Sequence, residues 1–211
     1  MITRNLNLII NIGVTVSKCI KGIIFDMDGT LTIPSIDFIE LRRILNMKPD
    51  QDLLKVLETY GEEKKQYTIQ IIEKFEKEAS DNIELQPNVN SVLSTFNKLD
   101  IKMGIVTRNS KKNAIKVLSL IDVDFDPILS REFTPYKPDP APVNFILDKW
   151  NIKPENVMIV GDYRDDILCG INAGVSTCFF MNSDKASYAE LSDYSVSSFD
   201  ELKNIIITAN E

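Results

Sequence analysis

Two acids, Asp26 and Asp28, stand one residue apart directly after the apolar segment GIIF, and Gly29 and Thr30 follow them. Clustered carboxylates repel one another, so they either share protons or hold a cation. Because successive side chains of a strand alternate in direction, Asp26 and Asp28 would share a face if the strand ran straight on. The pair therefore indicates a site for proton transfer or cation binding at the end of a strand.

Other polar side chains stand where further apolar segments end, namely Thr107, Asp162 and, in the loop YKPDP, Lys137. In open parallel sheets, ligands bind beyond the carboxyl ends of the strands. Oxygen ligands fit Mg²⁺, which takes one or two carboxylates, keeps several waters and contacts a substrate phosphate. Ca²⁺ stays open on ligand chemistry alone, although the lysine and the threonine favour an anion beside the cation. We expect a magnesium site that holds a phosphoryl group, and spacing alone does not decide which aspartate attacks it.

Short apolar runs rich in β-branched residues predict the strands that position these groups. They cover residues 22–26, 101–107, 156–162 and 174–181, with 126–130 as a weaker candidate. Each run is almost continuously apolar, as is typical of parallel strands covered on both faces. Helical patterns lie between them at residues 88–99, 110–121, 139–150 and 165–174. This alternation predicts an α/β fold, a three-layer doubly wound (Rossmann-like) parallel sheet.

Three residues mark expected helix ends. Pro87 stands where proline favours a helix start, and Ser110 is a plausible N-cap. Gly174 is expected to end the helix that begins near residue 165.

Residues 34–86 break the alternation of strands and helices. Three amphipathic patterns, at residues 36–46, 51–60 and 62–80, have apolar residues three and four positions apart. We predict a helical cap over residues 34–86, inserted into an α/β core formed by residues 1–33 and 87–211. The charge run from Glu62 to Lys65 is interpreted as a solvated helix face.

The composition narrows the classes of function. The chain has 211 residues and a formal charge of −7, so it lacks the general basic field that collects nucleic acid or an anionic membrane. It contains no histidine, which removes Ser-His-Asp hydrolysis and zinc sites that need imidazole. Its three cysteines form no CxxC pair, suit a reducing compartment and are expected to be small buried apolar residues. No apolar run reaches the ~18 residues that a membrane helix requires.

The segment DMDGTLT resembles the first motif of the haloacid dehalogenase superfamily, whose members are mostly magnesium-dependent phosphatases. The segments GIVTRN, YKPDP and VGDYRDDILCGINAG follow in the order of the second, third and fourth motifs of that family. The resemblance covers the whole core and extends to the phosphoglycolate phosphatase-like subgroup, which has a small helical cap between the first and second motifs. Four ordered motifs make the resemblance specific, whereas DGT alone would be weak.

The resemblance implies roles for the residues of these motifs. Asp26 would be the nucleophile that becomes phosphorylated, and Asp28 would protonate the leaving oxygen and later activate water. Magnesium would be bound by the carboxylates of Asp26 and Asp162 and by the backbone carbonyl of Asp28. Thr107 and Lys137 would hold the phosphoryl group, with Lys137 also restraining the charge on Asp26.

Four further residues complete the implied site. Asp166 stands at the usual spacing after Asp162 and would support metal-bound waters, and Asp165 would assist it. Arg108 and Asn109 would border the pocket and contact the phosphorylated substrate, although Arg108 is equally well interpreted as a surface residue.

The sequence leaves alternatives to a phosphatase open. A sugar-phosphate mutase of the same superfamily would need a cap that holds a bisphosphate while excluding water, which the sequence neither shows nor excludes. A phosphoacceptor signalling module of the receiver type also combines acids, a threonine and a lysine, but such domains are shorter and lack a cap. Dehalogenation is disfavoured, because the dehalogenating relatives lack an acid at the place of Asp28.

The first 21 residues carry Arg4, Lys18 and Lys21 and no acid, a bias compatible with organelle targeting. Asn7, Asn11 and Gly13 interrupt their apolar part, so an extra strand or arm before the core is the favoured interpretation. We expect a cytoplasmic protein whose partner is a small phosphorylated metabolite, with no nucleic acid and no membrane. The oligomeric state stays open.

Overall fold

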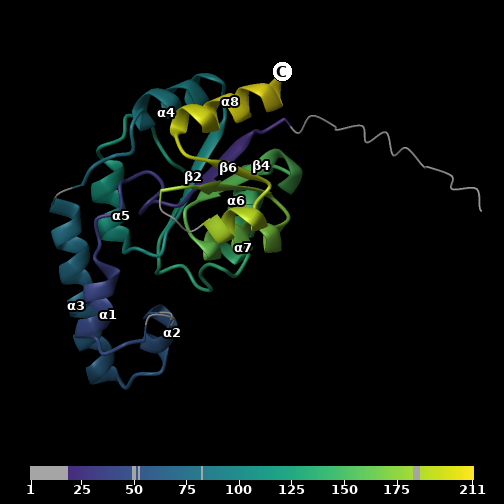
Figure 1. Ribbon diagram of the computed structural model, residues 1–211. Helices are drawn as coiled ribbons and strands as arrows, with labels where there is room; N and C mark the ends of the chain where they lie inside the picture. Colours follow the sequence, from purple (N-terminus) through teal and green to yellow (C-terminus); the bar gives the residue numbers. More distant parts are fainter. Residues whose placement is uncertain (1–18, 49–50, 52, 82, 183–185) are drawn as a thin grey trace, which may run out of the picture.

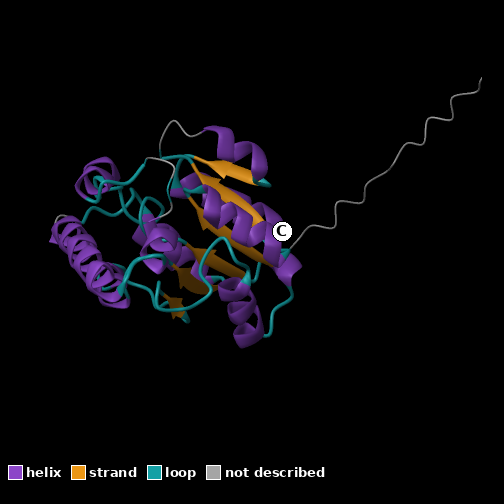
Figure 2. Ribbon diagram, turned by 90° about the horizontal axis from the view of Figure 1, so that it is seen from below, coloured by secondary structure: helices purple, strands orange, loops and turns teal. Residues whose placement is uncertain are grey.

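A six-stranded sheet forms the centre of the computed structural model, which describes residues 19–48, 51, 53–81, 83–182 and 186–211. The strand order is β3-β2-β1-β4-β5-β6, and each neighbouring pair runs parallel. The strands are β1 (Gly22–Phe25), β2 (Lys102–Val106), β3 (Ile128–Leu129), β4 (Val157–Gly161), β5 (Ser176–Phe180) and β6 (Tyr194–Val196). Helices cover both faces of this sheet (Figure 2). The predicted α/β class with a doubly wound parallel sheet is confirmed.

The helices of the core divide between the two faces of the sheet. One layer contains α4 (Val89–Lys98), α5 (Lys111–Leu118) and α8 (Phe199–Asn210), and the other contains α6 (Ala141–Trp150) and α7 (Arg164–Ala173). Figure 1 shows α4 and α8 together on one side and α6 and α7 on the other. Of two short 3₁₀ helices, η1 (Pro154–Asn156) precedes β4 and η2 (Ala186–Leu191) lies between β5 and β6.

The central strand β1 shows why its sequence is apolar throughout. Ile23 and Phe25 pack into the cluster shared with α4 and α8, whereas Ile24 packs into the cluster shared with α6. All three side chains are fully buried, so neither face of the strand tolerates a polar residue. A rigid, buried strand therefore carries Asp26 at its end.

The expected helix ends agree with the structure in two of three cases. Ser110 Oγ accepts a hydrogen bond from the backbone N–H of Asn113 at the start of α5, and Gly174 ends α7 with φ of 74°. Pro87 lies outside helix α4, because Asn88 occupies the cap position with φ of 64° and the helix begins at Val89. The prediction for Pro87 was therefore wrong by two residues.

The cysteine prediction also needs a correction. Cys169 and Cys178 are buried, as expected of small apolar residues, but Cys19 is exposed. It lies three residues before the start of β1. The expected arm or targeting segment, residues 1–21, lies largely outside the described residues.

The helices expected between residues 34 and 86 are α1 (Phe38–Ile44), α2 (Leu53–Glu58) and α3 (Glu62–Asp81). They lie together, away from the sheet (Figure 1), around the buried side chains Leu41, Leu57 and Ile72. We call α1–α3 the cap helices. In the part of the chain that the structure describes, no helix combines the length and apolarity of a membrane span.

Two extended segments connect the cap helices to the core and run side by side. The N–H of Ile33 donates to the carbonyl of Glu84 (2.8 Å), and the N–H of Gln86 donates to the carbonyl of Leu31 (2.9 Å). Thr32 and Leu85 form an antiparallel bridge between these bonds. The exact domain boundaries stay predictions.

Candidate active site

Three neighbouring strands are each followed at once by a polar residue. Asp26 comes directly after β1, Thr107 directly after β2 and Asp162 directly after β4. Because the three strands are parallel and adjacent, these residues meet at the same edge of the sheet. The sequence prediction that polar groups gather at this edge is confirmed.

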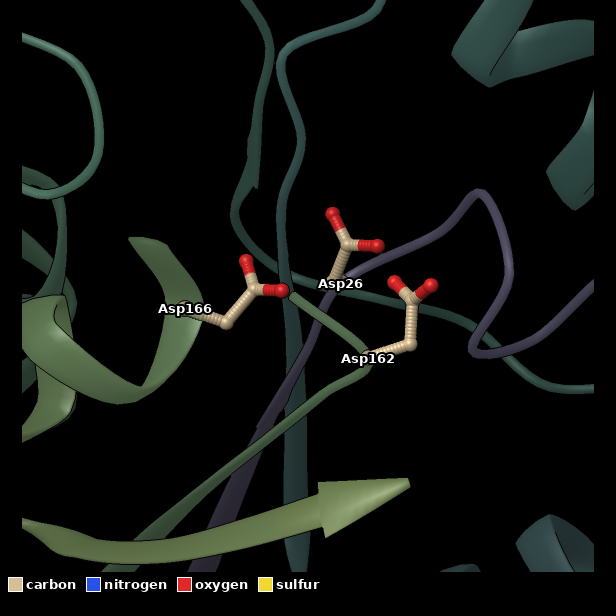
Figure 3. A group of neighbouring side chains, drawn as sticks. All are labelled: Asp26, Asp162 and Asp166. Atoms are coloured by element: carbon tan, nitrogen blue, oxygen red, sulfur yellow. The ribbon is translucent and has the colours of Figure 1, made fainter. Parts of the chain in front are cut away.

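An acidic group lies at the centre of this edge. Asp26, Asp162 and Asp166 each offer a carboxylate oxygen, and these three oxygens lie within 4.8 Å of one another. Figure 3 shows the three carboxylates turned toward a common space, with Asp26 on the end of β1 and the other two on the β4–α7 segment. This acidic group can hold one cation.

Lys137 contacts two carboxylates of the acidic group from the buried side. Its Nζ donates to Oδ1 of Asp26 (2.7 Å), to Oδ1 of Asp166 (2.5 Å) and to the carbonyl of Val106 (2.7 Å). The side chain is only 2% exposed, so all three N–H groups of a buried ammonium have acceptors. Burial would lower the pKa of Lys137, but the charges of Asp166 and Asp26 outweigh it and raise that pKa. The lysine is therefore a permanent positive charge beside Asp26.

Asp166 acts mainly on the protein itself. One carboxylate oxygen accepts from Lys137, and the other accepts from the backbone N–H of Tyr163 at the start of α7 (3.0 Å). Gly161 permits this arrangement, since a Cβ there would lie 2.3 Å from Cβ of Asp166. Both oxygens are engaged, which suits a residue that holds Lys137 and supports the cation site from behind.

Sequence reasoning missed Asn182. Its Nδ2 donates to Oδ2 of Asp162 (3.0 Å) and to the carbonyl of Gly29, so the amide links the ends of β1, β4 and β5. Both acceptors lack a proton to donate, which fixes the orientation of the amide. The position two residues after β5, at the same edge of the sheet, was a signal that could have found it.

Asp28 lies apart from the acidic group and contacts Asn109. Nδ2 of Asn109 donates to Oδ2 of Asp28 (3.0 Å), and the N–H of Asn109 donates to Oγ1 of Thr107 (3.0 Å). Burial raises the pKa of Asp28, opposed by the Asn109 hydrogen bond and by the charge of Lys137. Asp28, Asn109 and Thr107 thus form one hydrogen-bonded series beside the acidic group.

Arg108 and Asp165 form an ion pair at the rim. Nη1 of Arg108 lies 2.7 Å from Oδ2 of Asp165, and the guanidinium lies over the ring of Tyr136 at 5.6 Å. The structure therefore places Asp165 against Arg108 and outside the acidic group, and makes Arg108 a partly buried residue beside Thr107.

The electrostatics of the acidic group call for a cation. Burial raises the pKa of Asp26 well above its ordinary value, Lys137 opposes this, and the charges of Asp166, Asp162 and Asp28 add to the rise. One ammonium does not balance these carboxylates, and a divalent cation would lower the pKa of Asp26 and favour its ionised form. A donor set made only of oxygens fits a hard cation such as Mg²⁺ or Ca²⁺.

The chain combines a doubly wound parallel sheet, cap helices inserted after its first strand, and an acid-and-lysine site at the carboxyl edge of the sheet. This combination fits a hydrolase of the α/β class. The chain belongs to the haloacid dehalogenase-like hydrolase family, which matches residues 34–180. That match begins after Asp26 and Asp28, which are placed in the site by its geometry. Membership in a hydrolase family favours an enzyme over a signalling module.

Individual proteins support the same assignment. A haloacid dehalogenase-like hydrolase domain-containing protein of Arabidopsis thaliana is 33% identical over 216 residues, covering 94% of this chain and 88% of that protein. A phosphoglycolate phosphatase of Pasteurella multocida is 34% identical over 93 residues, covering 43% of this chain and 42% of that protein. The crystal structure of a hydrolase from Pseudomonas syringae has a TM-score of 0.75 at 18% identity, covering 87% of this chain and 96% of that one, and supports the fold alone.

Proposed function

We propose that this protein is a magnesium-dependent phosphatase that hydrolyses a small phosphomonoester through an aspartyl-phosphate at Asp26. One observation carries the proposal: the Asp26 carboxylate, at the end of a rigid strand, contacts Lys137 through Oδ1 alone. Among the described residues, none donates a hydrogen bond to its Oδ2. We assign the attack on phosphorus to that oxygen.

In the first step, Oδ2 of Asp26 attacks the phosphorus atom and the bond to the leaving oxygen breaks. Asp28 gives its proton to that oxygen, which leaves as an alcohol. The raised pKa of Asp28, caused by its burial, supports this role. Asn109 holds the Asp28 carboxyl in place.

In the second step, the ionised Asp28 takes a proton from water. The water oxygen forms a bond to phosphorus, the bond between phosphorus and Asp26 breaks, and inorganic phosphate and the free Asp26 carboxylate result. Asp28 is again protonated, so the cycle closes without another general acid or base.

The phosphoryl group would lie between the cation and the groups after β2. Thr107 offers its hydroxyl, and Arg108 and Asn109 border the same place. Lys137 already donates all three N–H groups to protein acceptors, so contact with a phosphoryl oxygen requires it to exchange one of them. In this proposal, the main role of Lys137 is to balance the negative charge of Asp26.

Magnesium would be held by the carboxylates of Asp26 and Asp162 and by the backbone carbonyl of Asp28, with Asp166 in support; Asp165, paired with Arg108, would take no part. When bound, it supplies positive charge that neutralises the phosphoryl oxygens and the carboxylates around them. Asn182 orients Asp162 for this task.

Phosphoglycolate and hexose phosphates are the first substrates to test, because phosphoglycolate phosphatases are among the relatives of the chain. The experiment measures phosphate release from a panel of phosphorylated metabolites with Mg²⁺ and with a chelator, for the wild type and for Asp26→Asn. We expect release that needs both Mg²⁺ and Asp26. Isomerisation of a sugar phosphate without release of phosphate would support the mutase alternative instead.

A further inference from the structure

Polar contacts between the cap helices and the core differ sharply in burial. Glu76 of α3 lies 2.5 Å from Nη1 of Arg131, and the two side chains are only 8% and 16% exposed. The ion pair between Asp81 of α3 and Lys116 of α5 has a similar distance, 2.7 Å, but its side chains are 58% and 48% exposed. A buried ion pair is held by its surroundings, and removing one partner is costly, whereas an exposed pair contributes little.

A continuous series of hydrogen bonds leads from Arg131 to Asp28. The backbone N–H of Arg131 donates to the carbonyl of Asn109 (3.0 Å), and Nδ2 of Asn109 donates to Oδ2 of Asp28 (3.0 Å). Oδ1 of Asn109 accepts from the N–H of Ser110 (2.8 Å), which fixes the orientation of the amide. The segment that presents Asn109 to Asp28 is therefore anchored by Arg131.

Other contacts restrain the same segment. Glu132 accepts from the N–H of Lys111 with both carboxylate oxygens (3.2 Å each). The charge of Asp28 also acts on Glu76. The cap helix α3 and the loop after β3 thus hold the residues that hold Asp28.

We propose that Glu76 and Arg131 are positioning residues, which set the orientation of Asp28 through Asn109. Neither side chain is assigned a contact with the reacting atoms. The ion pair fixes Arg131, Arg131 fixes the backbone of Asn109, and Asn109 fixes the carboxyl that transfers the proton. This inference rests on the proposed role of Asp28 as proton donor.

The test compares two substrates that depend differently on proton transfer. An aryl phosphate such as p-nitrophenyl phosphate has a leaving group that departs without much protonation, whereas an alkyl phosphate needs a proton on its leaving oxygen. Displacement of Asp28 therefore slows hydrolysis of the alkyl ester selectively, whereas a general loss of folded protein slows hydrolysis of both esters equally. The measured quantity is the ratio of kcat/KM for the aryl ester to kcat/KM for the alkyl ester.

The variants are Glu76→Gln and, as the matched control, Asp81→Asn, which removes an ion pair between the same helix and the core. We expect Glu76→Gln to raise the ratio about tenfold, a part of what general acid catalysis contributes, and Asp81→Asn to leave it within about twofold of wild type, as for an exposed pair. An unchanged ratio in Glu76→Gln, or the same change in both variants, would overturn the inference.

Arg131→Lys serves if Glu76→Gln fails to fold. It keeps a positive charge near Glu76 but changes the geometry of the pair, so we expect the ratio to rise in the same direction, and an unchanged ratio overturns the inference. NMR signals of the Asn109 side-chain amide are expected to shift in either variant and not in Asp81→Asn. If the wild type cleaves neither ester with Mg²⁺, the proposed function itself has failed; if it cleaves both and the ratio never changes, only the positioning role has failed.

Discussion

Lys137 and Asp26 meet in the interior of the protein, with Nζ of the lysine 2.7 Å from Oδ1 of the aspartate. The lysine comes from the loop after β3 and the aspartate from the end of β1, so the contact joins two strands that are not neighbours in the sheet. The buried ammonium opposes the rise that burial causes in the pKa of the buried carboxylate. This contact supports the proposal that Asp26 is the reactive carboxylate.

Replacement of Lys137 by Met is the first prediction. The change leaves Asp26 and Asp166 buried without their counter-charge, so we expect loss of about 3–5 kcal/mol of unfolding free energy and loss of nearly all phosphatase activity. Urea unfolding and phosphate release measure the two effects. Lys149→Met is the control, because its partner Asp126 is 73% exposed, and should cost less than about 1 kcal/mol. Equal destabilisation by both variants would contradict the account.

A second prediction concerns the cation. The proposed Mg²⁺ site exists only in the folded protein, so addition of Mg²⁺ should raise the melting temperature of the wild type, and EDTA should reverse the rise. Asp162→Asn removes one carboxylate and should weaken Mg²⁺ binding by about tenfold or more, as loss of a ligand group does. Asp148→Asn makes the same chemical change at an exposed position of α6 and should keep the wild-type shift. A Mg²⁺ shift that survives Asp162→Asn would place the cation elsewhere.

The fold was largely predictable because burial on both faces of the sheet makes strands nearly continuously apolar. The apolar patterns at residues 22–26 and 156–162 located β1 and β4, respectively, within a residue or two. Strand β6 and helix α8 were not anticipated, since β6 has three residues, two of them exposed, and carries little apolar signal. The predictions for Cys19 and Pro87 were wrong because both residues lie just before an element, β1 and α4 respectively. The sequence pattern does not fix the exact residue at which an element begins.

The sequence predicted those site residues that directly follow a strand. Asp26, Thr107 and Asp162 each follow a strand directly, so topology alone brings them together. Asn182, Glu76 and Arg131 were missed because their importance comes from contacts between distant segments, such as Asn182 with Asp162. No spacing in the sequence reports a contact of that kind.

Gly29 offers a third prediction. Its φ is 88°, and a Cβ there would lie 2.5 Å from Oδ2 of Asp162 and 2.7 Å from Nδ2 of Asn182. Gly29→Ala should therefore displace Asp162, reduce Mg²⁺ affinity and activity, and cost about 1–3 kcal/mol of stability. Gly61→Ala is the control, because no atom lies within 4 Å of a Cβ at that position. If Gly29→Ala binds Mg²⁺ as tightly as the wild type does, the close packing around Asp162 is not needed for Mg²⁺ binding.

A fourth prediction concerns pH and Glu76. Burial raises the pKa of Glu76 from 4.5 to about 7, although Arg131 opposes the rise. The folded state then holds this proton more tightly than the unfolded state, so the contribution of Glu76 to unfolding free energy falls as pH rises from 4.5 to about 7 and is constant above. The size of that fall is up to about 3 kcal/mol.

Urea unfolding at pH 5 and pH 8 measures this fall. Glu76→Gln carries no titrating group there and should lose it, so the variant becomes less sensitive to pH than the wild type. Glu73→Gln removes an acid from the same helix that is 59% exposed and 4.0 Å from Arg131, and it should keep the wild-type pH dependence. The prediction is wrong if Glu76→Gln and the wild type change stability in parallel between the two pH values.

The most direct test of the phosphatase mechanism is to trap the phosphorylated enzyme. The wild type is mixed with substrate and Mg²⁺, quenched in acid and digested, and the peptide that contains Asp26 and Asp28 is analysed by mass spectrometry. We predict one phosphoryl group on Asp26 in the wild type, and neither label nor turnover in Asp26→Asn. A phosphoryl group on Asp28, or wild-type turnover by Asp26→Asn, would contradict the account.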